Sequence, residues 1–215
     1  MPQKNSLPQN NNEQKTSRFY RNFVATFHGL AEFLWPHTAH GSLTLPEGGC
    51  VICPNHLSFA DIPVVSCVFR GRTLKYMAKK ELFFWPLGCL FRALGAYAVD
   101  RKKGDVGALK TAISVAEAGD CAVIFPQGHR NPGVDPKETV VHGGAMFVAK
   151  KANVPIIPVY IKAKNRKVRF FSKLEVFVAP PIYPESFAEY GETNNEAMKN
   201  VFLRACEMEE TGKWS

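Results

Sequence analysis

Hydrophobic and polar positions along this 215-residue chain follow two spacings, one typical of strands and one typical of helices. Short apolar runs predict strands at residues 50–53, 73–78, 95–99 and 121–125. Apolar residues at helical spacing predict helices at residues 60–69, 79–92, 105–118 and 140–151. Strands that alternate with helices are typical of an α/β sheet with helices on its faces. We therefore expect one α/β domain built on a mixed, mostly parallel sheet.

The last third of the chain has a different pattern. Residues 154–161 and 168–179 predict two further strands, and residues 163–167 between them predict a turn. So short a connection joins antiparallel strands, so we expect a C-terminal antiparallel hairpin at the edge of the sheet. A helix at residues 193–210 follows.

The first 36 residues divide into two segments. Residues 1–17 are rich in Asn, Gln, Lys and Ser and predict a disordered polar tail. Residues 18–36 predict an amphipathic helix with an apolar stripe at Phe19, Phe23, Phe27, Leu30, Ala31 and Leu34. Two interpretations are open: the helix packs on the core, or its aromatic face enters the interface of a bilayer. The folded domain would then comprise residues 37–215.

The chain is basic, with a formal charge of +8 at pH 7 and a pI of about 9.2. This charge suits nucleic acid, an anionic lipid surface or a phosphorylated substrate. No nucleic-acid-binding module accompanies it, so nucleic acid is not an expected partner. The sequence has no run of about 18 uncharged apolar residues, so no transmembrane helix is expected.

Six cysteines are present, at positions 50, 53, 67, 89, 121 and 206. Cys50 and Cys53 form a C-x-x-C pair, but no second Cys or His pair follows at zinc spacing. We expect buried, reduced thiols in a cytosolic protein, and no metal site.

The candidate chemistry begins at Asn55 and His56, after an apolar strand, with Asp61 following after four further residues. Histidine titrates near neutral pH, and a carboxylate can fix its tautomer and stabilise its charged form. Such a pair can take a proton from a hydroxyl nucleophile. Ser58 would cap the next helix, or that helix begins nearer Asp61, which brings Pro63 close to a permitted first-turn position.

Three further stretches follow apolar, strand-like segments: residues 99–103, 125–130 and 154–159. In an α/β sheet, the loops after the strands gather along one edge. Two guanidiniums there, those of Arg101 and Arg130, would clamp a phosphate, although each arginine alone is equally a solvated surface charge. Gly128 removes a side chain where a backbone approaches a ligand.

The four motifs are Asn-His-x4-Asp, Val-Asp-Arg, Phe-Pro-x-Gly-x-Arg and Val-Pro-Ile-Ile-Pro-Val. Their order resembles the glycerolphosphate acyltransferases, most of all the 1-acyl-glycerol-3-phosphate acyltransferases, which acylate lysophosphatidic acid. The resemblance covers roughly residues 45–180. It implies that His56 is the general base for the acceptor hydroxyl, that Asp61 orients it, and that this hydroxyl attacks an acyl thioester directly. The substrate-binding residues it implies are Asn55, Ser58, Arg101, Gln127, Gly128, Arg130 and Pro155.

Within that set, Arg101 and Arg130 would hold the acceptor phosphate, and Pro155 would help form the acyl-donor site. The sequence departs from the family at two places. Gln127 stands where the family usually has Glu, with His129 in place of Thr, and Val141-His142-Gly143 lacks a lysine that the family often carries. These changes put the identity of the acceptor in question more than the type of reaction.

The resemblance also implies the partners of the protein. These are a lysophospholipid acceptor, acyl-CoA or acyl-carrier protein as co-substrate, and an anionic membrane surface, with no cofactor and no metal. A basic segment at residues 162–173 is either a solvated hairpin tip or a patch for anionic lipid, coenzyme A phosphates or an acidic carrier protein. The aromatic run at residues 82–87 belongs to the core, lines a groove for the acyl chain or touches the bilayer.

The expected enzyme makes phosphatidic acid as a peripheral, monotopic protein on the cytoplasmic face of a membrane, with residues 37–215 as its acyltransferase domain. Two alternatives remain. The same chemistry could act on another lysolipid, or the protein could be a catalytically silent lipid-binding homologue, since Gln127 replaces an acid.

Overall fold

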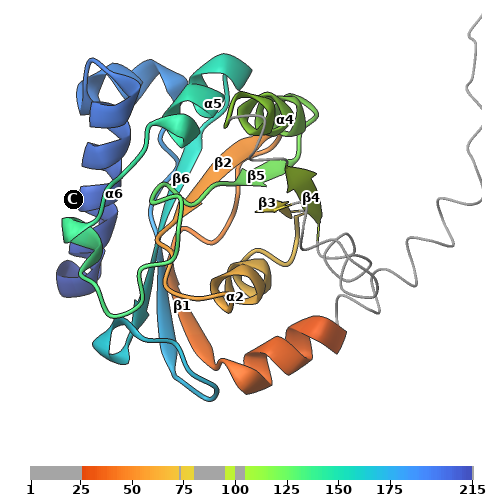
Figure 1. Ribbon diagram of the computed structural model, residues 1–215, viewed down its shortest axis with the longest axis vertical. Coiled ribbons are helices and arrows are strands. Elements are labelled where there is room, and N and C mark those ends of the chain that lie inside the picture. Colours follow the sequence, from red (N-terminus) through yellow and green to blue (C-terminus); the bar gives the residue numbers. More distant parts are fainter. Residues whose placement is uncertain (1–25, 73, 80–94, 100–104, 215) are drawn as a thin grey trace, which may run out of the picture.

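The computed structural model describes residues 26–72, 74–79, 95–99 and 105–214. Within these ranges the strands form one sheet in the order β1-β7-β6-β2-β5-β3-β4, with helices on both faces (Figure 1). The strands are β1 (His37–Gly41), β2 (Cys50–Pro54), β3 (Leu74–Lys79), β4 (Ala96–Val99), β5 (Cys121–Val123), β6 (Ile156–Ala163) and β7 (Leu174–Val178). The helices are α2 (Asp61–Val68), α4 (Asp105–Glu117), α5 (Gly144–Ala152) and α6 (Asn194–Thr211), with short 3-10 helices η3 (Pro136–Glu138), η4 (Lys164–Arg166) and η5 (Pro184–Tyr190).

The sheet is mixed but mostly parallel, as the sequence predicted. Strands β6, β2, β5, β3 and β4 are parallel, whereas β7 pairs antiparallel with β6 and β1 pairs parallel with β7. We call the side on which the five parallel strands end the carboxyl edge, and the opposite side the amino edge. In an open α/β sheet, loops at the carboxyl edge hold the functional groups.

Two hydrophobic cores lie on the two faces of the sheet. One packs α4, α5 and α6 against residues such as Val51 and Ile156. The other packs α2 against residues such as Ile52 and Ile157. Because both faces are covered, the central strands are apolar at nearly every position, which explains their continuous hydrophobic runs in the sequence.

The predicted hairpin exists, but its predicted position at the edge of the sheet is wrong. Strands β6 and β7 pair antiparallel from Val159↔Val178 to Ala163↔Leu174. Strand β1 then covers β7 in parallel register and takes the edge. The sequence His-Thr-Ala-His-Gly of β1 has a single apolar side chain, because an edge strand that is largely half-exposed needs no hydrophobic run.

The second hairpin strand is also shorter than the prediction of residues 168–179. Strand β7 begins only at Leu174, and the chain before it turns, with Phe171 at a φ of 61°. The backbone N–H of Phe171 donates to the carbonyl of Leu34, which ties this turn to helical residues 26–34. Of the helix expected at residues 79–92, Lys79 ends strand β3, and the remainder lies outside the described residues, as do the aromatic run at 82–87 and the polar tail at 1–17.

The described cysteines, at positions 50, 53, 67, 121 and 206, are buried free thiols. Cys50 belongs to the core on the α2 face and Cys53 to the core on the α4 face, as the alternation of side chains along a strand requires. The C-x-x-C pair therefore points to opposite sides of the sheet and cannot chelate one ion. Burial raises the pKa of the Cys206 thiol to about 12.

Candidate active site

The loop between β2 and α2 carries the histidine and the aspartate that the sequence singled out. Strand β2 is buried along its whole length and delivers the chain to the carboxyl edge at Pro54. Helix α2 begins at Asp61, the later of the two starts considered from the sequence. Pro63 therefore lies in the first turn, where its missing N–H leaves no helical hydrogen bond unmade.

His56 and Asp61 form a direct pair. Nδ1 of His56 lies 2.8 Å from Oδ2 of Asp61. The same carboxylate oxygen accepts hydrogen bonds from the backbone N–H groups of Leu57 at 2.7 Å and Ser58 at 2.8 Å. Asp61 is fully buried, and its position at the first residue of α2 places its charge where the helix dipole favours an anion.

This pairing sets the chemistry of the imidazole. A carboxylate oxygen that already accepts two backbone N–H groups acts as an acceptor, so Nδ1 of His56 carries the hydrogen and Nε2 keeps its lone pair. No described residue makes a hydrogen bond to Nε2, and the His56 side chain is 14% exposed. In this arrangement Nε2 of His56 can accept a proton, and the carboxylate of Asp61 can stabilise an imidazolium.

The loop after β5 encloses His56 from the other side. The ring of Phe125 stacks on the imidazole at a centroid distance of 3.9 Å and an interplanar angle of 19°. The backbone N–H of Asn131 donates to the carbonyl of His56 at 2.8 Å. The ring and the backbone of His56 are thus both held by residues about 70 positions further along the chain.

Gln127 contributes a third contact from this loop. Its side chain is fully buried, and Oε1 accepts the backbone N–H of His56 at 2.7 Å. Nε2 donates to the hydroxyl oxygen of Thr139, also at 2.7 Å. Gln127 was predicted to bind substrate, and that role remains a prediction, but both ends of its amide are occupied by the protein.

Gly128 follows at a φ of +72°, a left-handed conformation that favours glycine. A Cβ at this position would also lie 3.4 Å from the ring of His142. The backbone N–H of His142 donates to the carbonyl of Pro126 at 2.9 Å, which brings His142 against the loop. The glycine thus allows a tight turn directly beside an exposed imidazole.

Arg130 ends the loop on the exposed side of the site. Its guanidinium carbon lies 3.8 Å above the ring of Phe59, a residue between His56 and Asp61 that is itself 57% exposed. This cation–π contact holds a positive charge over the loop that carries His56. Arg101 lies outside the described residues.

Asn55, Ser58 and Pro155 occupy different surroundings from those expected of ligand-binding groups. Asn55 is fully buried, and its amide donates to the carbonyl of Ile161 at 3.0 Å and accepts the N–H of Ile161 at 2.6 Å. Ser58 Oγ accepts the N–H of Ala60 at 3.2 Å, which shapes the turn into α2. Pro155 lies buried at the amino edge, where its carbonyl accepts the N–H of Val51. The structure therefore does not bring Pro155 together with His56.

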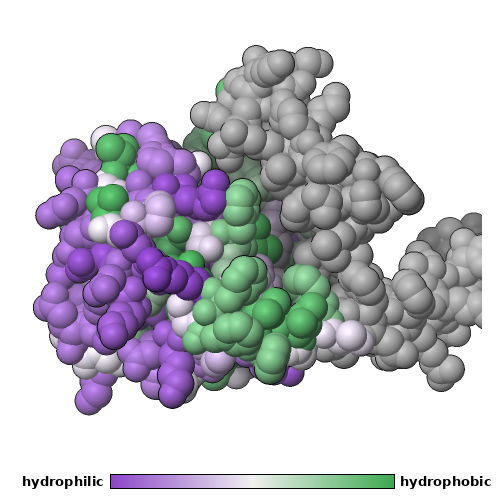
Figure 2. Space-filling model, turned by 60° about the horizontal axis from the view of Figure 1, so that its bottom comes forward, coloured by the Kyte–Doolittle hydropathy of each residue, from purple (hydrophilic) through white to green (hydrophobic). Residues whose placement is uncertain are grey.

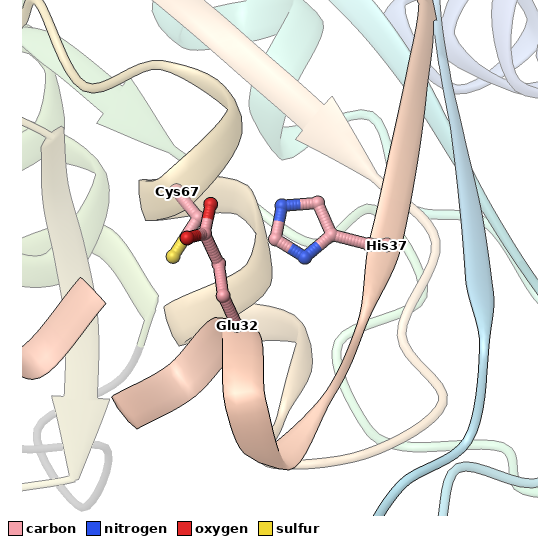
Figure 3. A group of neighbouring side chains, drawn as sticks. All are labelled: Glu32, His37 and Cys67. Atoms are coloured by element: carbon pink, nitrogen blue, oxygen red, sulfur yellow. The ribbon is translucent and has the colours of Figure 1, made fainter. Parts of the chain in front are cut away.

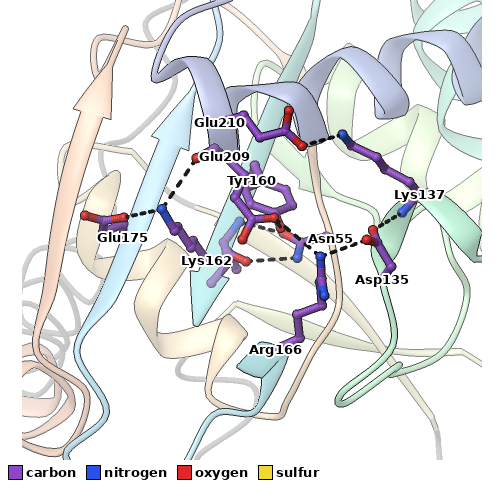
Figure 4. A network of polar contacts seen from close by, with 10 residues as sticks. Asn55, Asp135, Lys137, Tyr160, Lys162, Arg166, Glu175, Glu209 and Glu210 are labelled. Atoms are coloured by element: carbon purple, nitrogen blue, oxygen red, sulfur yellow. Dashed lines mark hydrogen bonds and ion pairs between the residues drawn. The ribbon is translucent and has the colours of Figure 1, made fainter. Parts of the chain in front are cut away.

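Ion pairs attach the continuation of the loop, residues 131–139, to the rest of the domain (Figure 4). Arg166 contacts Asp135 at 2.7 Å and Glu209 at 4.0 Å. Lys137 contacts Glu210 on α6 at 3.0 Å. Exposed pairs of this kind contribute about 0–1 kcal/mol each. Their position matters more than their strength, because they join η3, η4 and α6 around the chain that supports Gln127.

A second cluster of ligand-type side chains lies away from this site, where Glu32, His37 and Cys67 bring donor atoms within 4.8 Å of one another (Figure 3). Arg70 already pairs with Glu32, and its guanidinium holds a positive charge beside the position of any cation. Burial raises the pKa of the Cys67 thiol to about 11, and its sulfur donates to the carbonyl of His28. A neutral thiol and a neutralised carboxylate do not fit a resident metal ion.

Sequence reasoning missed most of the residues that contact the ring and the backbone of His56. Phe125 lay within a quoted motif, but its stacking on His56 was not predicted. Asn131, Thr139 and Phe59 carried no signal of their own, because their contributions are a backbone N–H, a hydroxyl and an exposed ring. The signal that was available is the polar stretch that begins at Gln127 in the loop after β5.

The chain matches the acyltransferase family over residues 37–162. It is similar to three proteins named 1-acyl-sn-glycerol-3-phosphate acyltransferase. The one from Bacillus subtilis (strain 168) is 26% identical over 66% of this chain and 71% of the relative. The one from Streptococcus pneumoniae is 31% identical over 69% and 58%. The human beta protein is 28% identical over 72% and 60%. The chain thus spans from under three fifths to about seven tenths of the length of these relatives.

A solved structure supports the same fold. The crystal structure of the 1-acyl-sn-glycerophosphate (LPA) acyltransferase PlsC from Thermotoga maritima superposes with a TM-score of 0.70. It covers 95% of this chain and 85% of its own, at 22% sequence identity. The family match spans more than half of the chain and contains both the His56–Asp61 pair and the loop that encloses it. This protein therefore belongs to the acyltransferase family.

Proposed function

We propose that the protein transfers a fatty acyl group from an acyl thioester to the free hydroxyl of a lysophosphatidic acid-type acceptor, and so makes phosphatidic acid. The observation that carries the proposal is the His56–Asp61 pair at 2.8 Å, in which Nε2 has no partner among the described residues. The relatives whose names include this activity support the choice of acceptor.

In the proposed reaction, Nε2 of His56 accepts the proton of the acceptor hydroxyl as its oxygen attacks the thioester carbonyl. The new bond joins oxygen to the carbonyl carbon, and the bond from that carbon to sulfur breaks. The imidazolium, stabilised by Asp61, returns the proton to the leaving thiolate. Such base catalysis contributes about 10²–10⁴-fold, so holding the two substrates together supplies much of the remaining acceleration. The step needs no metal or prosthetic group, because the thioester is already activated.

Binding of the acceptor phosphate would fall to Arg130, with Arg101 as a second contributor. Arg130 is exposed and lies over Phe59, within the loop that joins His56 to Asp61. A guanidinium presents parallel N–H groups that match two phosphate oxygens. In this arrangement a phosphate held by Arg130 brings the rest of the acceptor toward the imidazole. The donor is acyl-CoA or acyl-carrier protein.

The test is an acyl-transfer assay with purified protein, lysophosphatidic acid and either donor, followed by detection of phosphatidic acid and of free thiol. We expect both products in equal amounts. Gln127 and His129, which depart from the family pattern, motivate two alternatives: a different lysolipid acceptor, or lipid binding without catalysis. A panel of lysolipid acceptors separates them. Turnover with another lysolipid and none with lysophosphatidic acid would replace the acceptor. Lipid binding without thiol release from any donor would favour a silent lipid-binding protein.

We also propose that the protein docks on anionic membranes through an aromatic patch, defined here as Leu30, Phe33, Trp35, Phe170 and Phe171. Phe33 and Phe170 are each 66% exposed, and Phe171 is 60% exposed. Phe33 packs edge-on against Phe171, and Trp35 stacks on Phe170, each with centroids 5.5 Å apart. Figure 2 views the molecule from this side and has apolar surface gathered there. A contiguous apolar patch on a soluble domain marks an interaction surface.

Cations beside this patch favour an anionic lipid as the partner. Of the basic segment at residues 162–173, Lys162 pairs with Glu175 and Arg166 with Asp135, so these two are neutralised (Figure 4). The exposed basic residues of the segment are Lys164, Lys167, Arg169 and Lys173. Each cation near an anionic surface adds about 1 kcal/mol to binding. No helix in the described ranges combines the length and apolar character needed to cross a bilayer.

The topology gives this docking a consequence for the site. Strand β6 ends at Ala163, which pairs with Leu174 of β7, and Leu174 pairs with His37 of β1. Helical residues 26–34 and the turn at Phe171 therefore lie at the carboxyl edge, the same edge that carries His56. A protein docked by the aromatic patch turns this edge toward the membrane, where a lysolipid acceptor resides.

Flotation with vesicles of phosphatidylcholine and phosphatidylglycerol tests the docking. We expect the protein to float at low salt and the double variant Phe33→Ser/Phe171→Ser to remain at the bottom. Val106→Ser is the matched control, because Val106 is 65% exposed but lies on α4. Equal flotation of the wild type and the double variant would remove the patch from the proposal.

A further inference from the structure

Three residues of one loop fix the position of His56. Phe125 stacks on its ring, Asn131 binds its carbonyl, and Gln127 binds its backbone N–H at 2.7 Å. The ring nitrogen Nδ1 is held separately by Asp61. Among these four contacts, two come from polar side chains. Asp61 follows His56 closely in the sequence, whereas Gln127 belongs to a distant loop. The side chain of Gln127 is fully buried.

The hydrogen bonds around Gln127 have a single consistent direction. Thr139 Oγ donates to the carbonyl of Pro136 at 2.7 Å, so its oxygen is available as an acceptor. Nε2 of Gln127 donates to that oxygen, and Oε1 of Gln127 accepts from His56. An amide satisfies both neighbours, since it has a donor at one end and an acceptor at the other. A carboxylate would face Thr139 with an acceptor and force its hydroxyl to abandon Pro136.

We propose that Gln127 is a positioning residue that fixes the backbone of the general base, and that the pair Gln127–Thr139 does this without a second buried carboxylate near His56. The proposal rests on the acyl transfer proposed above and assigns Gln127 a role other than substrate contact. Among the described residues, the charged side chains near the imidazole are Asp61 from α2, in contact with Nδ1, and Arg130 from the loop, over Phe59. A carboxylate at position 127 would add a negative charge and favour the imidazolium.

The first arm of the test measures kinetics. We expect Gln127→Ala to lower kcat by about 10²-fold with little change in either KM, because a base displaced by a fraction of an ångström loses alignment with the hydroxyl. We expect Gln127→Glu to move the acid limb of the pH–rate profile to higher pH by about one unit. An increase in the KM for the acceptor at unchanged kcat would overturn the proposal, because it would mark Gln127 as a substrate contact.

The second arm does not depend on activity. Amide hydrogen exchange of His56 should accelerate in Gln127→Ala, since the N–H loses its acceptor, and should be unchanged in the control Thr38→Val on exposed β1. Unchanged exchange in Gln127→Ala would overturn the proposal. If the wild type is inactive with every acceptor, the proposed function fails while this arm still decides the role of Gln127.

Because Gln127→Ala truncates a buried side chain and could fail to fold, Thr139→Val serves as a second variant. It leaves Gln127 in place and removes the hydroxyl that accepts from its Nε2, together with the bond of that hydroxyl to the carbonyl of Pro136. We expect the His56 amide to exchange faster and kcat to fall about tenfold, less than in Gln127→Ala. Wild-type exchange and wild-type kcat in a folded Thr139→Val protein would show that the Thr139 half of the pair is not needed.

Discussion

The two ends of the parallel strands use similar residue types in opposite ways. At the amino edge, Arg72 donates to the carbonyls of Pro46, Gly48 and Gly119, so its guanidinium is consumed by the backbone. At the carboxyl edge, Arg130 lies over the ring of Phe59 and has no ion pair with a described residue, and His56 keeps one nitrogen without a described partner. The guanidinium of Arg72 at the amino edge therefore holds the fold together, whereas Arg130 and Nε2 of His56 at the carboxyl edge retain capacity for a ligand.

This comparison teaches that position along a strand decides what a motif does. Pro155 and His56 both flank buried strands, and both were predicted to serve the substrates. Pro155 precedes β6 at the amino edge, and His56 follows β2 at the carboxyl edge. The largest effects on activity should therefore come from the carboxyl edge, and substitutions at the amino edge should change stability instead.

His56→Ala carries the largest expected effect. We expect kcat/KM to fall by about 10⁴-fold, since the proton acceptor is lost, while the melting temperature stays close to that of the wild type. His40→Ala is the matched control, because His40 lies on the edge strand β1 and stacks on Phe177 of β7. A His56→Ala enzyme with more than a tenth of wild-type activity would end the assignment of the base.

Asp61→Asn should follow, with a loss of about 10³-fold in kcat, because an amide no longer fixes the tautomer of His56. One carboxylate oxygen of Asp61 now accepts three hydrogen bonds, so this variant should also lose about 1–3 kcal/mol of stability. The readouts are steady-state kinetics and urea unfolding. A loss of stability without a loss of kcat would make Asp61 purely structural.

Arg72→Ala should reverse the pattern. Three backbone carbonyls lose their donor, so we expect a loss of about 1–3 kcal/mol in the free energy of unfolding. The kcat/KM of the folded fraction should match the wild type. A drop in kcat/KM larger than the unfolded fraction explains would show that the two edges are coupled.

Pro155→Ala should give the smallest effect. The residue is buried and contributes a backbone carbonyl that alanine retains, so we expect a loss of about 0.4–1 kcal/mol from the greater freedom of the unfolded chain. The KM for the acyl donor should not change. A several-fold increase in that KM would restore the role that the sequence suggested for Pro155 and contradict the separation of the edges.

Much of the fold could be predicted because both faces of the sheet are buried. Short, largely apolar stretches marked β2, β3 and β5, and helical spacing marked α4. Helix α6 lies within one residue of its predicted bounds. Strand β1 could not be found this way, since its side chains are half-exposed or exposed. Its partner β7 also lies more than 130 residues further along the sequence. The turn before β7 imitated a strand because it contains Phe170 and Phe171, a residue type common in strands, although both side chains are exposed.

The site was predictable in its chemistry but not in its supports. His56 and Asp61 are close in sequence, and their pairing needs only one turn of chain. The contacts of Gln127 and Asn131 with the backbone of His56 arise from tertiary packing, which no local pattern encodes. For the same reason, Asn55 resembled a ligand-binding residue by its place beside His56, while its amide is bound to Ile161.

The pairing of Asn55 with Ile161 has a mechanical consequence. The amide acts as an extra rung between β2 and β6, two residues before β6 ends and one peptide bond before His56. Any tilt of the β6–β7 arm must break both of these bonds or carry the base with it. In the proposed docking, a lipid surface that contacts Phe170 and Phe171 acts on strands joined to β2 both by the β2–β6 ladder and by the Asn55 amide, which directly precedes His56.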